Sequence, residues 1–243
     1  MRAIDVLLSG FFGSSNRGFL GWGAMYLVTL PSGRRLIFDT AGYNERGTIP
    51  KLLEERGIGV TAIDWVVLSH LHFDHAANWD LFPNADLVVH EKEIAYAQAT
   101  DDTAVLRYQA PVLLANNRLH LIREESSTLE NGVQVFHVPG HTPGAIALTI
   151  EDSVLSGDAL KSRWDLRGLL TDTWNDELAR QSIQKITKLG NRIYPGHDMP
   201  LERHGSDWVP CGIPSVRLLF PDGSEQVIEP PAAQSERHAW QNT

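Results

Sequence analysis

The run His70-Leu-His72-Phe-Asp74-His75 places four potential metal ligands within six residues. On an extended backbone, side chains two residues apart project to the same side, so His70 and His72 can approach one cation together. Asp74 and His75 then follow into the start of a helix, where they can reach a second cation beside the first. Imidazole and carboxylate groups are the ligands of zinc, manganese and iron sites. The segment therefore predicts a metal site.

Three further potential ligands follow the ends of expected strands. His141 lies in Pro-Gly-His-Thr-Pro-Gly, Asp158 in Ser-Gly-Asp-Ala, and His197 in Tyr-Pro-Gly-His-Asp. We expect each to be exposed on a glycine-containing turn, where the backbone can come close to a ligand. Together with the six-residue run they complete a set of donors for two cations. The other histidines have no such spacing, and we interpret them as structural or solvent-facing.

Short apolar strands bounded by Gly, Pro, Asn or Asp must position these side chains. Strands are expected in two batches, each with flanking helices, which indicates an α+β protein with two sheets packed face to face and helices outside. The expected strands are 3–8, 24–30, 34–38, 64–68 and 86–89, then 118–122, 133–138, 145–150, 153–155 and 193–194. The expected helices are 48–56, 92–99 and 175–189, and Pro-Asp-Gly predicts a hairpin between 216–220 and 225–228.

Composition limits the function classes. We expect one domain over residues 1–230 and a disordered tail over 231–243. The net charge of −9 disfavours a nucleic acid or an anionic membrane as partner and leaves a small-molecule substrate. The single cysteine, Cys211, excludes an intramolecular disulfide and a cysteine-based zinc site. No signal peptide or membrane-spanning run is recognisable, so a cytoplasmic protein is expected; the oligomeric state is left open.

With these motifs in place, the sequence resembles the metallo-β-lactamase superfamily over about residues 1–205. The resemblance implies a four-layer αββα sandwich with two divalent metal ions in a cleft at one edge, zinc first and manganese or iron as alternatives. It implies that His70, His72 and His141 bind one ion, that Asp74, His75 and His197 bind the other, and that Asp158 bridges the two. Asp39, in Phe-Asp-Thr, matches the acid that supports the ligand loop.

Two ions that share a water molecule lower its pKa towards ~7, and the resulting hydroxide can attack a carbonyl or phosphoryl centre. Asp74 and Asp158 are placed to accept a hydrogen bond from that nucleophile, and they are the expected catalytic residues. No Gly-x-Ser-x-Gly motif offers a protein nucleophile. Trp22, in the Gly-rich stretch 18–23, is predicted to fold over the cleft, with Phe11, Phe12, Phe19 and Leu20 as apolar surface. Trp164 and Trp174 are the predicted facing wall.

Comparison with subfamilies narrows the substrate. Zinc β-lactamases usually carry Cys or Ser where Asp158 stands, and glyoxalase II has a helical C-terminal domain that the residues after His197 are too few to form. Quorum-quenching lactonases are similar through His-Leu-His-Phe-Asp-His-Ala, but they have Tyr where this chain has Lys161. Lys161 is expected either to contact an oxyanion or carboxylate or to lie in solvent. The sequence favours hydrolysis of a lactone, ester or thioester.

Three alternatives of other classes remain. A persulfide-dioxygenase-like enzyme would need one iron held by His70, His141 and Asp158, and the intact second ligand set disfavours it. A nuclease or phosphodiesterase is disfavoured by the acidic net charge. The third alternative is a protein that binds metal without catalysis.

Overall fold

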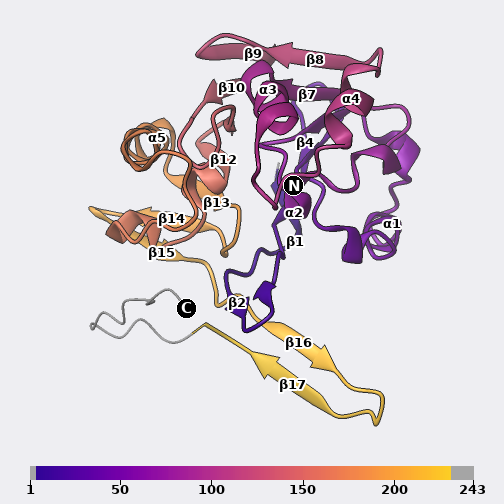
Figure 1. The fold of residues 1–243 in the computed structure, drawn as a ribbon, viewed down its shortest axis with the longest axis vertical. Coiled ribbons are helices and arrows are strands. Elements are labelled where there is room, and N and C mark those ends of the chain that lie inside the picture. The colour runs from indigo at the N-terminus through magenta and orange to yellow at the C-terminus, as the bar shows by residue number, and fades with distance from the viewer. Residues whose placement is uncertain (1–3, 231–243) are drawn as a thin grey trace.

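The computed structural model describes residues 4–230 of the chain, so the predicted tail 231–243 lies outside the described residues. The polypeptide forms two large mixed sheets that face each other, one from each half of the chain (Figure 1). The order of strands in the first sheet is β1-β4-β5-β6-β7-β8, and in the second it is β15-β14-β13-β12-β11-β10-β9. The two predicted batches of strands therefore correspond to the two sheets with one exception: strand 118–122, expected in the second batch, pairs with the first sheet.

The first sheet comes from the N-terminal half of the chain. Its antiparallel part, β1 to β5, gives way to a parallel part, β5 to β8, whose carboxyl ends meet at one edge. The strands are β1 (Ile4–Leu8), β4 (Met25–Thr29), β5 (Arg35–Phe38), β6 (Trp65–Val67), β7 (Asp86–His90) and β8 (Leu119–Ile122). The helices of this half are α1 (Ile49–Glu54), α2 (Phe73–Ala76), α3 (Glu91–Ala99) and α4 (Gln109–Leu114), and β2 (Ser14–Ser15) and β3 (Gly18–Phe19) form a small hairpin.

The second sheet is antiparallel except where β12 and β13 run parallel, joined by the long helix α5. Its strands are β9 (Ser126–Glu130), β10 (Val133–His137), β11 (Ile146–Ile150), β12 (Ser153–Gly157), β13 (Arg192–Pro195), β14 (Leu201–His204) and β15 (Asp207–Pro210). Helix α5 (Asp176–Leu189) begins as predicted, because the Asn175 side chain accepts a hydrogen bond from the backbone N–H of Leu178. Thr48, the first residue of the predicted helix 48–56, precedes α1, and its side chain makes no such hydrogen bond.

Alternation of apolar side chains along the strands builds three separate cores. In β4, Met25 and Leu27 face the helices of the first half, whereas Tyr26 and Val28 face the second sheet. In β12, Leu155 joins the core between the sheets, and its neighbour Val154 packs towards α5. Because successive strand residues point to opposite faces, each sheet is covered on both sides. The layers run helix, sheet, sheet, helix, and the predicted α+β sandwich of four layers is confirmed.

A second hairpin, β16 (Val216–Leu219) with β17 (Glu225–Ile228), pairs with neither large sheet and projects from the body (Figure 1). It is the hairpin that the Pro-Asp-Gly turn predicts. Helix α4 and the strands β2, β3, β9, β14 and β15 were not predicted. Among the described residues, no helix is long and apolar enough to cross a membrane.

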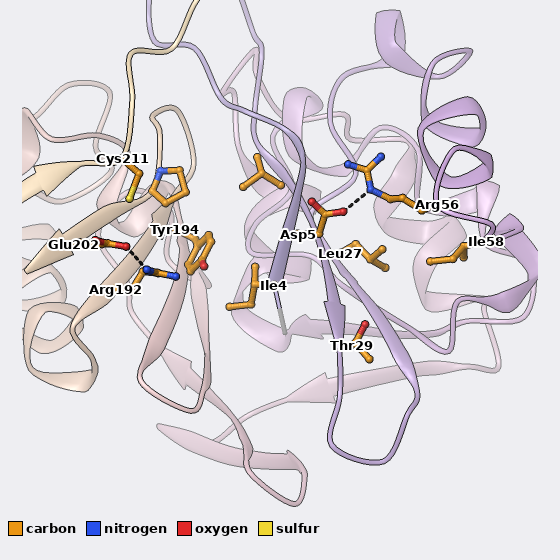
Figure 2. A pocket seen from close by; sticks show the side chains of 12 residues that line it. Ile4, Asp5, Leu27, Thr29, Arg56, Ile58, Arg192, Tyr194, Glu202 and Cys211 are labelled. Atoms are coloured by element: carbon orange, nitrogen blue, oxygen red, sulfur yellow. Dashed lines mark hydrogen bonds and ion pairs between the residues drawn. The ribbon is translucent and has the colours of Figure 1, made fainter. Parts of the chain in front are cut away.

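A cleft of about 760 Å³ opens between the free edge of β1 and strands β13 and β14. Its floor is apolar, and two ion pairs, Arg56 with Asp5 and Arg192 with Glu202, stand on its walls (Figure 2). None of the predicted metal ligands lines it. The cleft is therefore a different place from the site of the His and Asp motifs.

Candidate metal centre

The seven predicted ligands all follow strands and come from both halves of the sandwich. His70 and His72 follow β6, and Asp74 and His75 lie on α2, the short helix that comes next. The other three come from the second half and are reached after β10, β12 and β13: His141, Asp158 and His197. The structure brings all seven to one edge of the sandwich, where the two sheets meet.

The ligand atoms fall into overlapping groups, each with its atoms within 4.8 Å of one another. The first group, here called the three-histidine position, is His70, His72 and His141. The second, here called the Asp-His-His position, is Asp74, His75 and His197. Asp158 lies between them: its Oδ2 is 3.4 Å from His141 Nε2 and 3.3 Å from His197 Nε2.

All seven residues are buried, with at most 8% of the surface of any of them exposed. The expectation that His141, Asp158 and His197 would be exposed on turns is therefore wrong. Each turn is covered by the opposite half of the sandwich, which a single segment of sequence does not reveal. Burial of this many ionisable groups is costly unless they are paired or bind a cation.

Asp39 orients two of the histidines. It accepts hydrogen bonds from the Ser69 backbone N–H (2.7 Å), from the Ser69 hydroxyl (2.7 Å) and from His75 Nδ1 (2.8 Å). The Ser69 hydroxyl lies 2.9 Å from His70 Nδ1, and because it donates to Asp39 it must accept there. Both imidazoles therefore carry their proton on Nδ1 and keep the Nε2 lone pair for a ligand.

His72 and His197 are oriented in the same way by other partners. His72 Nε2 donates to Asp102 Oδ2 (3.0 Å), which leaves its Nδ1 free and 3.1 Å from His141 Nε2. His197 Nδ1 donates to the backbone carbonyl of Trp22 (3.1 Å), which leaves Nε2 facing His75 Nε2 at 3.1 Å. Four of the five imidazoles thus have a partner that fixes the tautomer, as metal-binding histidines usually do.

The remaining polar atoms fit divalent cations. Among the described residues, the buried polar atoms without a hydrogen-bond partner include three on the predicted ligands: His70 Nε2, His141 Nδ1 and Asp158 Oδ1. Burial lowers the pKa of His70 well below its usual range, so its nitrogen is a neutral donor. Burial acts in the same direction on His75, but the carboxylates of Asp158, Asp74 and Asp39 outweigh it and raise the pKa of that imidazole. The carboxylates of the pocket therefore attract positive charge, and His70 offers a neutral nitrogen lone pair to a cation.

Two glycines permit close contacts beside the ligands at this edge, one within the second half and one between the halves. A Cβ on Gly196 would overlap Asp158 Oδ1, and one on Gly157 would overlap the Ser69 side chain. Gly157 also has a positive φ of 50°, which an L side chain adopts only with strain. The glycines beside Asp158 and His197 thus have a steric reason to be glycine.

Lys161 lies at the rim of the site and is largely covered, with 15% of its side chain exposed. Its Nζ is 3.8 Å from Asp158 Oδ2 and 3.6 Å from Asp172 Oδ2, and it donates to the Thr171 carbonyl. Of the two expectations for this residue, a position in open solvent is wrong. The ammonium group is held beside the candidate bridging carboxylate.

Aromatic side chains gather around Trp22 and Trp164. Trp22 packs edge-to-face on Phe11, with ring centroids 6.0 Å apart, and Trp164 packs the same way on Phe12 at 6.2 Å. Phe11 and Phe12 stack on each other, so the four rings form one continuous cluster. Because the Trp22 carbonyl contacts His197 and Trp164 follows Lys161 by three residues, this cluster adjoins the candidate metal centre.

Two carboxylates that contact this centre were not among the predicted site residues. Asp102 accepts from His72, and this hydrogen bond holds the pKa of Asp102 well below its usual range. Glu93 is fully buried on α3 and accepts from the backbone N–H groups of Leu71 and Gly144. Each contacts its partner through the fold rather than along the chain, so no local pattern marks it.

The comparisons agree with this geometry. Residues 22–197 match the family model described as the metallo-β-lactamase superfamily. A probable metallo-hydrolase of Methanocaldococcus jannaschii is 26% identical over 165 residues, which cover 67% of this chain and 70% of that protein. An N-acyl homoserine lactonase of a Bacillus species is 29% identical over 169 residues, which cover 65% of each chain.

Solved structures show the same fold. A Thermotoga maritima protein, a candidate metallo-β-lactamase by its description, superimposes with a TM-score of 0.67 at 22% identity and covers 82% of this chain and 98% of its own. The Bacillus thuringiensis lactonase AiiA, with N-decanoyl-L-homoserine bound at its active site, gives a TM-score of 0.61 at 21% identity, with 76% and 86% covered. A dizinc quorum-quenching lactonase, AidC, gives 0.62 at 20%, with 78% and 80% covered.

Proposed function

We propose that this chain, which belongs to the metallo-β-lactamase superfamily, is a hydrolase that binds two divalent cations, zinc foremost, and cleaves a lactone, ester or thioester bond of a small molecule. The observation that carries the proposal is the arrangement of the imidazoles. Four have one ring nitrogen satisfied by the protein and the other turned towards a shared space, with Asp158 between the two groups. Lactonases with the same fold support the bond class.

When bound, two such cations polarise a substrate carbonyl and lower the pKa of a nearby water towards ~7. The protein's own carboxylates would then manage the proton. Asp74 Oδ2 lies 3.4 Å from His197 Nε2, and Asp158 Oδ2 lies 3.3 Å from the same nitrogen, so both acids face one small volume. In our proposal they accept a hydrogen bond from the attacking water and orient it, which makes them the catalytic residues.

Lys161 supplies a positive charge at the rim, where the oxygen of the substrate would develop negative charge. We propose that its ammonium stabilises that oxygen or binds a carboxylate of the substrate. The aromatic cluster of Phe11, Phe12, Trp22 and Trp164 would pack against an apolar part of the same molecule. The proposed substrate is therefore a small amphipathic carbonyl compound, with no nucleic acid and no membrane involved.

Metal content is the first test. Protein expressed without added metal and purified without chelator is expected to carry close to two equivalents of zinc or manganese by elemental analysis. About one equivalent of iron would instead favour sulfur oxygenation by a single iron held by His70, His141 and Asp158. Less than half an equivalent of any transition metal, with none taken up on titration, would refute the proposal.

The second test is turnover. The metal-loaded protein is assayed with an N-acyl homoserine lactone, an unsubstituted γ-lactone, an aryl ester, an acyl thioester and bis(p-nitrophenyl) phosphate. We expect a carbonyl substrate to be cleaved and Asp158→Asn to lose at least about 100-fold in kcat/KM. Lys161→Met should lose roughly 10- to 100-fold, with Lys188→Met, on the exposed part of α5, as the matched control. Preference for the phosphodiester would overturn the assignment of the bond.

A further inference from the structure

The three-histidine position depends on a part of the fold whose acids hydrogen-bond to its ligand segments and not to the ligands of the Asp-His-His position. This part is helix α3 and the loop that follows it, residues 100–105, here called the α3 support. It contributes Glu93 and Asp102, both acids, and it contains none of the seven predicted ligands.

Asp102 fixes His72 directly. Its Oδ2 accepts from His72 Nε2 at 3.0 Å and from the Tyr96 hydroxyl at 3.1 Å, while Oδ1 accepts from the Ala104 backbone N–H at 2.9 Å. Tyr96 belongs to α3, so the carboxylate is anchored to the helix on one side and to its own loop on the other. The anchored carboxylate holds the His72 ring with Nδ1 towards His141.

Glu93 fixes the backbone on both sides of the position. Its Oε1 accepts from the N–H of Leu71, which lies between His70 and His72, and its Oε2 accepts from the N–H of Gly144, on the loop that carries His141; both distances are 3.0 Å. A Cβ on Gly144 would overlap the backbone of Glu93, so the loop packs directly on the helix. One buried carboxylate therefore joins the two loops that supply all three histidines.

The Asp-His-His position has different supports. His75 donates to Asp39, and His197 donates to the Trp22 carbonyl. Neither contact involves α3. Asp39 also reaches His70 through Ser69, so it serves both positions, whereas Asp102 and Glu93 serve one. The α3 support meets helix α2 at the backbone, where the Phe73 N–H donates to the Ala104 carbonyl at 2.8 Å.

We propose that Asp102 and Glu93 are positioning residues that set the metal affinity of the three-histidine position and leave that of the Asp-His-His position unchanged. The inference rests on the proposed pair of metal positions. Neither acid contacts substrate or cation; each acts through the orientation of a ligand. Mutation of a residue that hydrogen-bonds to a metal ligand typically lowers metal affinity 10- to 100-fold.

Metal-free protein titrated with Zn²⁺ against a chromogenic chelator tests this without any substrate. His197→Ala isolates the three-histidine position, and His141→Ala isolates the other. In the His197→Ala background, Asp102→Asn and Glu93→Gln should each weaken zinc binding 10- to 100-fold. In the His141→Ala background they should change it less than threefold.

The chain offers matched controls on the same segments. Asp101→Asn removes the neighbouring acid, which is fully exposed and pairs with Arg107, and Glu91→Gln removes an exposed acid of α3 that pairs with Arg123. Both should leave zinc affinity unchanged in either background. The metal-free thermal unfolding midpoint of Asp102→Asn should match that of Asp101→Asn within about 2 °C, which separates ligand positioning from loss of fold.

Equal weakening at both positions, or no weakening relative to the control variants, would overturn the proposal. If Glu93→Gln fails to fold, Asp102→Asn decides alone, since Asp102 lies in a partly exposed loop. The outcome is separable from the proposed function. If the wild-type chain binds two zinc ions and the variants change zinc affinity as described, but no carbonyl substrate is cleaved, only the proposed hydrolase is refuted. If neither Asp102→Asn nor Glu93→Gln changes zinc affinity at either position, only this inference is refuted.

Discussion

The pair Arg163–Asp198 offers a demanding test of the energetics around the site. Asp198 follows His197, and its side chain is completely buried. It accepts from Arg163 Nε (2.7 Å), Arg163 Nη2 (2.5 Å) and the backbone N–H groups of Arg163 (3.0 Å) and Met199 (2.8 Å). Removing the guanidinium leaves a buried carboxylate with only the two backbone donors.

Replacing Arg163 and replacing Asp198 should therefore change the free energy of unfolding by different amounts. Arg163→Met is expected to cost about 3–5 kcal/mol in the free energy of unfolding, because it strands a buried charge. Asp198→Asn should cost less, roughly 1–2 kcal/mol, because the amide still accepts from the backbone and the arginine, with 18% of its side chain exposed, can reach water. Arg46→Met, which breaks the exposed Arg46–Asp80 pair, is the control and should cost about 1 kcal/mol or less.

Urea unfolding of the metal-free proteins at constant pH measures these differences, with unchanged m-values as the check that the unfolded states are comparable. For a chain of this size the Arg163→Met loss corresponds to a fall of roughly 10 °C in the midpoint of thermal unfolding. The reasoning is refuted if the loss of unfolding free energy in Arg163→Met lies within about 1 kcal/mol of the loss in Arg46→Met. It is also refuted if Asp198→Asn loses more unfolding free energy than Arg163→Met.

Three further outcomes are expected. Burial raises the pKa of Asp165 to about 6, so the native state binds a proton more tightly than the unfolded state, and stability from this group rises as pH falls from about 7 to 4. Asp165→Asn should remove up to about 3 kcal/mol of the pH dependence of the unfolding free energy. Urea unfolding at pH 4, 5, 6 and 7 measures it, and the same dependence in the wild type and the variant would contradict this. Gly196→Ala should displace Asp158 and lower zinc stoichiometry below two in elemental analysis, while Gly205→Ala, on an open turn, should not. Removal of bound metal with a chelator should lower the midpoint of thermal unfolding by roughly 10 °C or more, since each ion at 1,000 times its Kd stabilises the folded state by about 4 kcal/mol. An unchanged midpoint in calorimetry would argue against metal at the site.

The fold was largely predictable because its signals are local. Strand alternation, the Asn175 cap of α5 and the Pro-Asp-Gly turn each act within a few residues, and each element appears where the pattern places it. The missed elements lack such signals. β9 is a polar strand at the end of its sheet, with no fully buried residue, and α4 begins without a capping hydrogen bond.

In the candidate site, too, the residues with local sequence signals could be predicted and the others could not. The seven ligands could be predicted because their residue types and turn motifs are visible in the sequence, and the structure brings them together. That they bind metal stays a prediction. Asp102 and Glu93 could not be found, because each lies 22 or more residues from the group it fixes and ordinary acids surround it in the sequence. The burial of the ligand turns was also invisible, because it results from contact between the two halves.

The construction of the site from two halves implies an order of events. Each half brings only part of either ligand group: the first supplies His70, His72, Asp74 and His75, and the second supplies the rest. Neither half alone offers three ligands to the three-histidine or the Asp-His-His position. The apolar core between the sheets contains no potential metal ligand, so it can form first and bring the ligand turns together. A glycine then permits the final approach, because a side chain at Gly157 would overlap Ser69 of the first half and push the halves apart at the ligands. Bound cations would thus join two halves that hydrophobic burial has already aligned, and metal binding should report on the packing of the whole sandwich.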